Sequence, residues 1–124
     1  MGIFNQRHKE LLPPRTAVEM KIEPGAEALL TQMGRKMHTK ARSKILDRAI
    51  GHLRETEHIS DITPWFSEER FCAQRRTTVR LSPENAAYAD TLAAMTGRGR
   101  PSLLLDMVYL AASRLGPEDY ETMR

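Results

Sequence analysis

The amino-acid sequence predicts a mainly α-helical fold that contains a two-stranded antiparallel β-ribbon. Two short segments, 17–22 and 76–81, alternate apolar and polar residues, as half-buried strands do. Each is followed by a helical segment that begins near a proline, and then by a second, more apolar helical segment. The two halves also match in pattern when the sequence is shifted by 59 residues without gaps.

The second strand is expected in the stretch RRTTVRLSPE, residues 75–84. Its alternation places Thr77, Val79 and Leu81 on an apolar face, and Arg76, Thr78 and Arg80 on the opposite face. By the shift of 59 residues, the first strand buries Val18, Met20 and Ile22 and presents Ala17, Glu19 and Lys21.

A helix is predicted after the second strand, in SPENAAYADTLAAMTG. Ser82 is the expected N-cap, Pro83 suits the first helical position, and Gly97 and Gly99 end the helix. Its expected apolar face consists of Tyr88, Leu92 and Met95. A second helix follows in RPSLLLDMVYLAASRL and stops at Gly116-Pro117. Its expected apolar side consists of Leu104, Leu105, Val108, Ala111, Ala112 and Leu115.

The shift of 59 residues indicates two copies of one unit, 15–54 and 76–115. One copy alone would leave both edges of its strand unpaired and its apolar helix faces exposed, so we expect the copies to fold together as one domain. The remaining segments are an N-terminal arm (1–14), a connector (55–75) and a C-terminal tail (116–124). The connector contains Trp65, Phe66 and Phe71, which we expect to pack on the body of the protein.

Composition and charge narrow the class of protein. No apolar run approaches the ~18 residues that a membrane span needs, residues 1–14 lack the apolar core of an export signal, and the single cysteine, Cys72, fits a reducing compartment. We therefore expect a cytoplasmic protein. The net charge is +3, and the two predicted units are basic, with nine Lys/Arg against four Asp/Glu in 15–54 and five against three in 76–115. This distribution favours a polyanionic partner.

Catalysis finds little support in the sequence. The histidines His8, His38, His52 and His58 have no metal-ligand spacing, and Cys72 with His58 makes no zinc set. The stretch GRGR at 97–100 lacks the context of a phosphate-binding loop and is interpreted as the turn between two helices. We expect no enzyme activity, no cofactor and no metal. The methionines Met20, Met33 and Met107 are interpreted as core residues.

Both copies resemble the ribbon-helix-helix, or Arc/MetJ-type, family of DNA-binding proteins. The stretches that carry the resemblance are VEMKIEPGAEALLTQMGRKMHTKARSKILDRAI and TTVRLSPENAAYADTLAAMTGRGRPSLLLDMVYLAA, and the two units make up 80 of the 124 residues. The resemblance implies a tandem ribbon-helix-helix pseudo-dimer. Two copies in one chain are similar to the TraY-type relaxosome proteins of conjugative plasmids.

The resemblance implies that the β-ribbon enters the DNA major groove and that its outward side chains contact bases. The implied base contacts are Arg76, Thr78, Arg80, Lys21, Glu19 and Ala17. Arginine suits this role because it can donate two hydrogen bonds to guanine O6 and N7. Ala17 offers only a methyl contact. Glu19 has three interpretations: it accepts from a cytosine amino group, pairs with an arginine across the ribbon, or weakens its half of the interface.

The family also holds DNA phosphates at the start of the second helix of each unit, where free backbone amides face the anion. The implied phosphate contacts are Lys40, Arg42, Ser43, Lys44, Arg98, Arg100 and Ser102. Ser43 and Ser102 are also expected to cap their helices. Pro101 removes one amide from the second of these sites, so the two halves are unequal and we expect an asymmetric DNA site.

The resemblance therefore implies a sequence-specific double-stranded DNA-binding protein, and its tandem form indicates a plasmid-transfer (relaxosome) accessory factor. The alternatives are a transcriptional repressor of the same fold and a toxin-binding antitoxin module. The expected partner is double-stranded DNA, with a relaxase or further copies of the chain as additional candidates. No membrane and no small-molecule ligand is expected.

Overall fold

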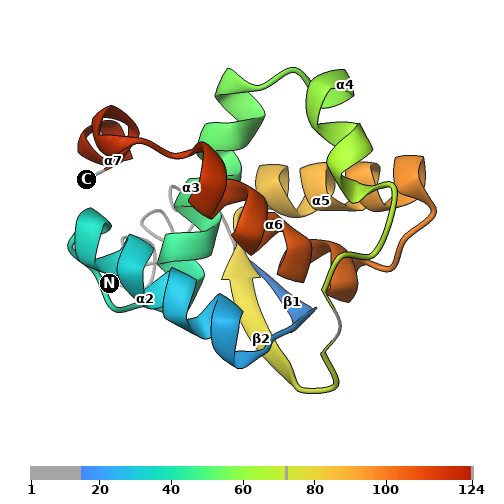
Figure 1. Ribbon diagram of the computed structural model, residues 1–124, viewed down its shortest axis with the longest axis horizontal. Coiled ribbons are helices and arrows are strands. Elements are labelled where there is room, and N and C mark those ends of the chain that lie inside the picture. Colours follow the sequence, from blue (N-terminus) through green and yellow to red (C-terminus); the bar gives the residue numbers. More distant parts are fainter. Residues whose placement is uncertain (1–14, 72, 124) are drawn as a thin grey trace, which may run out of the picture.

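The computed structural model describes residues 15–71 and 73–123. It is mainly helical and has one two-stranded antiparallel sheet, as predicted (Figure 1). The predicted N-terminal arm, 1–14, and Cys72 lie outside the described residues. The elements in order are β1 (Thr16–Lys21), α2 (Pro24–Met37), α3 (Arg42–Thr56), α4 (Ile59–Ile62), the 3-10 helix η1 (Thr63–Phe66), β2 (Arg76–Leu81), α5 (Pro83–Thr96), α6 (Arg100–Arg114) and α7 (Pro117–Met123).

The two strands pair antiparallel along their whole length, from Thr16 opposite Leu81 to Lys21 opposite Arg76. The predicted alternation is confirmed, since Val18, Met20, Val79 and Leu81 are buried and their neighbours in the strands are exposed or half-buried. One face of the ribbon therefore forms part of the core, and the other faces outward.

Helices α2 and α5 begin in the same way. Each has a proline in its first turn, where the missing N–H would have had no partner within the helix. Ser82 caps α5 as predicted, because its side chain accepts a hydrogen bond from the Asn85 amide. In α2 the cap is Glu23, whose carboxylate accepts from the Gly25 and Ala26 amides at 3.1 and 2.8 Å.

The same two helices also end in the same way. Gly97 terminates α5 with a left-handed backbone (φ 67°), which confirms the predicted break. His38 terminates α2 in the same conformation (φ 60°), although a residue with a Cβ atom favours it less than glycine does. A sharp turn into the next helix follows in both cases.

Helices α3 and α6 lack the serine caps that the sequence predicts. Their N-cap residues are Ala41 and Gly99, and neither makes a side-chain capping bond. Ser43 and Ser102 lie inside the first turn, so the prediction was wrong by two to three positions. Their hydroxyl groups contact other parts of the protein instead.

The core is built by crossed packing between the two halves of the chain. Helix α6 packs on β1, whereas α3 packs on β2, and α2 and α5 each contact both α3 and α6. Figure 1 shows α6 in the middle of the molecule, with α2 and α5 on either side of it. This central position buries α6 on nearly all sides, beyond the one apolar side that was predicted, and Leu103, Met107 and Leu110 are also buried.

The predicted apolar face of α5 was wrong in part. Leu92 is buried, but Tyr88 is only half-buried and Met95 is 52% exposed. The side of α5 that packs on the core carries mainly alanines, namely Ala86, Ala89 and Ala93.

The connector and the tail both pack on the body of the protein. Phe66 at the end of η1 is fully buried, and the ring of Phe71 stacks on Tyr109 of α6 with centroids 3.6 Å apart. This confirms the expected packing of the connector aromatics. The tail forms α7, whose Tyr120 is buried, and α7 contacts α2 and α3.

Candidate functional site

The outward face of the ribbon brings together the six residues that the alternation assigned to it. Antiparallel pairing places Ala17 opposite Arg80, Glu19 opposite Thr78, and Lys21 opposite Arg76. Lys21 is half-buried and the other five are exposed. The face therefore combines three cations with one carboxylate and a threonine hydroxyl on a surface two strands wide.

Glu19 and Arg76 form an ion pair across the two strands at 2.5 Å. Both side chains are about half exposed, 51% for Glu19 and 54% for Arg76. This contact matches one of the three interpretations of Glu19, the pairing with an arginine across the ribbon. Within the described residues no ion pair or side-chain hydrogen bond engages Lys21 or the Arg80 guanidinium.

The start of α3 is tied to the outer edge of this face. The Ser43 hydroxyl accepts a hydrogen bond from the backbone N–H of Arg80 at 2.9 Å. That amide lies on the free edge of β2, so the bond also satisfies a group that strand pairing leaves open. Lys40 and Lys44 lie close to Ser43 in the sequence and are exposed. One predicted phosphate contact, Ser43, thus touches a predicted base contact.

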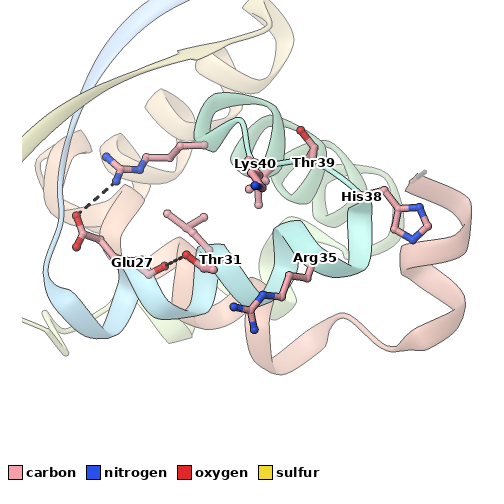
Figure 2. Close-up of a pocket in the computed structure, with 9 residues that line it drawn as sticks. Glu27, Thr31, Arg35, His38, Thr39 and Lys40 are labelled. Carbon is pink, nitrogen blue, oxygen red and sulfur yellow. Dashed lines mark hydrogen bonds and ion pairs between the residues drawn. The ribbon is translucent and has the colours of Figure 1, made fainter.

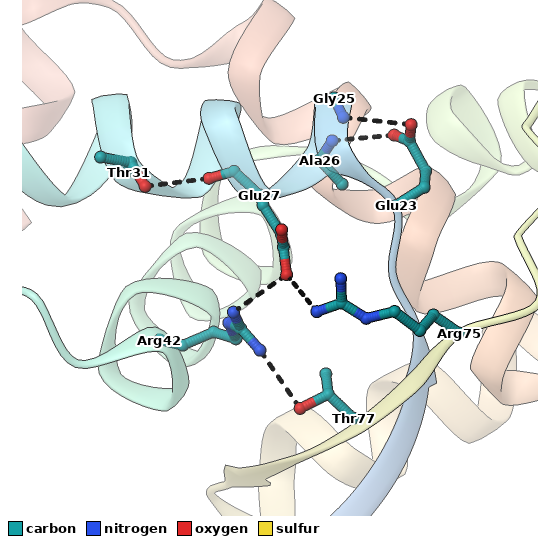
Figure 3. Close-up of polar contacts among 8 residues, drawn as sticks. All are labelled: Glu23, Gly25, Ala26, Glu27, Thr31, Arg42, Arg75 and Thr77. Atoms are coloured by element: carbon teal, nitrogen blue, oxygen red, sulfur yellow. Dashed lines mark hydrogen bonds and ion pairs between the residues drawn. The ribbon is translucent and has the colours of Figure 1, made fainter.

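Arg42, at the first position of α3, joins a polar network that sequence reasoning did not predict (Figure 3). Its guanidinium donates to the Thr77 hydroxyl of β2 at 3.2 Å and to the Glu27 carboxylate of α2 at 3.4 Å. The same Glu27 oxygen accepts a shorter bond from Arg75, at 2.6 Å. Nothing in the linear sequence connects Glu27, Arg42 and Arg75, because only the fold brings α2, α3 and the start of β2 together.

The start of α6 differs from that of α3. Arg98 forms a buried ion pair with Asp106 at 2.5 Å, and its side chain is only 8% exposed. Arg100 pairs with Asp90 at 2.8 Å, and the Ser102 hydroxyl donates to Glu69 of the connector at 2.9 Å. All three predicted phosphate contacts on this side therefore have partners within the protein.

Arg98 in particular leaves the set of candidate phosphate contacts. A phosphate could reach its guanidinium only if the pair with Asp106 opened, and breaking a buried ion pair leaves an uncompensated charge in the interior. This pair could not be predicted from the sequence, since an arginine in a glycine-rich turn is usually exposed. Glu69 was likewise missed, because its contact with Ser102 depends on how the connector folds back.

The junction of α2 with α6 is held by Glu23 and Tyr109. The Tyr109 hydroxyl donates a hydrogen bond to the Glu23 carboxylate. This bond is the main cause that lowers the pKa of Glu23, and the amides of Gly25 and Ala26 act in the same direction. Burial, together with the hydrogen bond to Glu23, raises the pKa of Tyr109 to about 12. The pair fixes the start of α2 directly after β1.

Other kinds of site are not found in the part of the chain that the structure describes. No group of three or more His, Cys, Asp and Glu side chains is placed to hold a metal ion there. None of the helices in residues 15–71 and 73–123 combines the length and apolar character needed to cross a membrane. Comparison with protein-family models, curated proteins and solved structures finds no match for this chain.

Proposed function

We propose that the chain is a tandem ribbon-helix-helix pseudo-dimer that binds double-stranded DNA by inserting its β-ribbon into the major groove. The observation that carries the proposal is the strand register, which gathers Lys21, Arg76, Thr78 and Arg80 on one outward face. A two-stranded ribbon fits the ~12 Å width of the groove, and arginine, lysine and threonine have the donors that base edges accept.

The structure supports the pseudo-dimer through an approximate two-fold relation between the halves. Glu19 lies opposite Thr78, which is the residue that the shift of 59 assigns to it. The same shift carries both ends of α2 onto both ends of α5, and it carries His38 onto Gly97, the two left-handed helix ends. The crossed packing of α6 on β1 and α3 on β2 obeys the same relation. Two intertwined copies of one unit, 15–54 and 76–115, account for all four features.

Base recognition is assigned chiefly to Arg80, Thr78 and Lys21. The side chains of Arg80 and Lys21 have no acidic partner within the described residues, so neither must break an ion pair to reach a base edge. Arg76 must share its guanidinium with Glu19 or release it. Ala17 contributes a methyl group at most.

Phosphate contacts are assigned mainly to one end of the ribbon. Lys40, Arg42, Ser43 and Lys44 surround the start of α3 next to Arg80. At the start of α6, Glu69 and Asp90 engage Ser102 and Arg100, which lowers the positive charge available to DNA. The proposal therefore includes an asymmetric DNA site, with stronger backbone contacts on the α3 side.

The test is selection of bound fragments from genomic DNA, followed by footprinting and by affinity measurements with variants. Arg80→Ala should weaken specific binding by about 10–100-fold, as expected for loss of a bidentate base contact. The control, Arg114→Ala, removes the same side chain at the far end of α6, next to Glu57, and should bind as the wild type does. If ~6–10 phosphates are contacted, wild-type affinity should fall by ~10³–10⁵ between 50 and 200 mM salt.

The proposal fails if no DNA fragment is enriched, if Arg80→Ala binds as tightly as Arg114→Ala, or if affinity hardly changes with salt. Footprints that protect the DNA backbone equally on both sides of the ribbon would contradict the predicted asymmetry of the DNA site, but not the binding of DNA itself.

The biological role proposed for this activity is that of a plasmid-transfer accessory factor, which marks or bends DNA for a relaxase. A transcriptional repressor would use the same residues, so the genomic position of the selected fragments separates the two roles. A toxin-binding role would need an exposed extension. Phe66 of the connector and Tyr120 of the tail are buried against the body, which does not favour that role.

A further inference from the structure

A groove of about 700 Å³ lies between α2 and the start of α3, on the side of the molecule next to the Arg42 network (Figure 2). Its lining residues are Glu27, Leu30, Thr31, Arg35, His38, Thr39, Lys40, Arg42 and Ile45. The volume is in the range of sites that hold small organic ligands. No residue of the ribbon's outward face lines the groove, so the proposed contacts with DNA bases do not assign a role to it.

The charge of the groove is strongly unbalanced. Three permanent cations line it, Arg35, Lys40 and Arg42, together with His38. Among the described residues Glu27 is the only acid in the lining, and its carboxylate is already engaged by Arg42 and Arg75. Within the described residues no hydrogen bond or ion pair occupies the side chains of Arg35 or Lys40. An anion in the groove would therefore meet cations without having to displace an acidic partner from them.

Arg42 is held by two bonds, to the Thr77 hydroxyl and to Glu27, and the bond to Glu27 can be broken at a small cost. Its bond to Glu27 is long, at 3.4 Å, and weak for a charged pair. The bond from Arg75 to the same oxygen is 2.6 Å, so Glu27 keeps a close counter-charge if Arg42 moves away. Arg75 thus leaves Arg42 available to a second anion.

The groove also has an apolar component. Leu30 and Ile45 form its base between the two helices, and the aliphatic parts of the lysine and arginine side chains extend it. Thr31 and Thr39 add hydroxyl groups at the sides, each already bonded to the backbone of its own turn. A ligand that matches this lining has an apolar body and an anionic group.

We propose that this groove binds a compact organic anion, an aryl or alkyl group that bears a phosphate or a carboxylate, and that the ligand and DNA compete. The competition rests on the proposed function, because Lys40 and Arg42 are also proposed phosphate contacts. A ligand that engages them withdraws two cations from the α3 side of the DNA interface. By linkage, DNA must then weaken the ligand by the same factor. This proposal replaces the expectation that the protein has no small-molecule ligand.

The ligand site is tested first in the absence of DNA. 1-Naphthyl phosphate and 1-naphthoate are titrated into the full chain, and binding is followed by calorimetry and by amide NMR. The controls are inorganic phosphate, which has only the anionic group, and 1-naphthol, which has only the aromatic body. At least one naphthyl anion should bind more tightly than both controls and shift amides within residues 27–45. The comparison of the two anions shows whether the groove prefers phosphate or carboxylate.

Variants then locate the site. Arg35→Gln, on an exposed turn of α2 and outside the proposed DNA contacts, should weaken the naphthyl anion by about tenfold, the size of one charge-assisted hydrogen bond. Arg114→Gln removes the same charge far from the groove and should leave ligand affinity unchanged. Both variants should keep the helical circular dichroism and the wild-type DNA affinity.

The last experiment tests whether binding of the naphthyl anion weakens binding of DNA. Saturating naphthyl anion should lower DNA affinity by about 5–150-fold, the usual range of coupling between two sites, and more than inorganic phosphate does at the same ionic strength.

The ligand site is wrong if neither naphthyl anion binds, or if Arg35→Gln binds the ligand as tightly as the wild type does, whatever the result with DNA. Loss of DNA affinity in Arg35→Gln would assign the groove to the DNA backbone and overturn it as well. If the ligand binds but leaves DNA affinity unchanged, the competition is wrong. If the ligand binds and no DNA is bound at all, the proposed function fails while the site stands.

Discussion

Glu19 is the residue that most changes the outward face of the ribbon. Its carboxylate lies among Lys21, Arg76 and Arg80, and it holds Arg76 at 2.5 Å. An exposed pair of this kind adds little to stability, because solvent screens the attraction. Its larger effect is on the surface that the protein offers to an anionic partner, since it removes one arginine from the available cations.

We expect Glu19→Gln to raise affinity for DNA on the order of tenfold, because Arg76 is released and a carboxylate no longer faces the phosphates. Titration of the selected DNA fragment by fluorescence anisotropy measures the change. Glu118→Gln, an equal loss of charge on α7, is the control and should have no effect. A fall in affinity would instead indicate that Glu19 accepts a hydrogen bond from a base.

The lowered pKa of Glu23 predicts that the stability of the fold depends on pH. Its folded-state pKa lies below the ordinary value of 4.5, mainly because the Tyr109 hydroxyl donates to the carboxylate. The ionised form is therefore favoured in the folded protein. This contribution is complete above pH 4.5, the ordinary value, and it is lost as pH falls through the lowered folded-state pKa.

Tyr109→Phe should destabilise the protein by about 1–2 kcal/mol at pH 7, and the difference from wild type should shrink as the pH falls toward 3. Urea unfolding at a series of pH values gives both quantities. Tyr88→Phe is the matched control: the Tyr88 hydroxyl is buried and has no hydrogen-bond partner in the described part of the chain, so its loss should be neutral or stabilising. An equal cost for both substitutions at every pH would contradict this role of Tyr109.

At the scale of elements, the two left-handed helix ends differ in a way that stability measurements can detect. Gly97 adopts φ 67° without strain, whereas His38 adopts φ 60° with a Cβ atom. In the described part of the chain, no atom beyond the adjacent residues lies within 4 Å of the position that a Cβ atom of residue 97 would take, so backbone conformation decides the effect of adding one.

We expect His38→Gly to stabilise the protein by about 0.5–1 kcal/mol and Gly97→Ala to destabilise it by about 1 kcal/mol. Thermal unfolding followed by circular dichroism measures both. Gly99→Ala is the comparison for the second change, because Gly99 has φ −71°, which alanine adopts readily. Because Gly99 is also the N-cap of α6, its substitution has a capping cost of its own. The backbone conformation of residue 97 is not important for stability if Gly97→Ala costs nothing.

The elements could be predicted where a local rule decides them. Alternation fixed the two strands and their outward residues, because the period of two leaves no choice once one face is apolar. Pro83 and Gly97 marked the ends of α5. The buried face of α5 could not be predicted from periodicity, since its alanines lie on several sides and only packing against α6, α3 and η1 selects among them.

The residues of the candidate site could likewise be predicted only where a local sequence rule decides their position. The six outward residues follow from the strands, but the partners of Arg42, Arg98 and Ser102 come from distant segments. The aromatic residues of the connector predicted that it packs on the body, but they did not predict the helices α4 and η1 or the contact of Glu69 with Ser102.

At the scale of the whole molecule, both halves of the ribbon belong to one chain, and so do the helices that cover it. A single chain that supplies both strands unfolds in a unimolecular reaction, unlike a dimer of two chains, whose stability depends on concentration.

We therefore expect the melting temperature to be independent of protein concentration over a hundredfold range, and light scattering to give the mass of a single chain, 14.1 kDa. Differential scanning calorimetry at several concentrations provides the first measurement. A melting temperature that rises with concentration would show that a second chain contributes to the folded state.

The crossed arrangement of strands and helices has a consequence for biosynthesis. While the ribosome is still making residues 76–81, β1 has already been synthesised and has no strand to pair with, and α3 has not yet met the strand it covers. The nascent first half exposes an open sheet edge and apolar helix faces, which are the features that chaperones bind and that cause aggregation. Stable folding must wait until α6 has been translated, so a premature stop codon anywhere before α6 would release a product in which β1 lacks the helix that covers it.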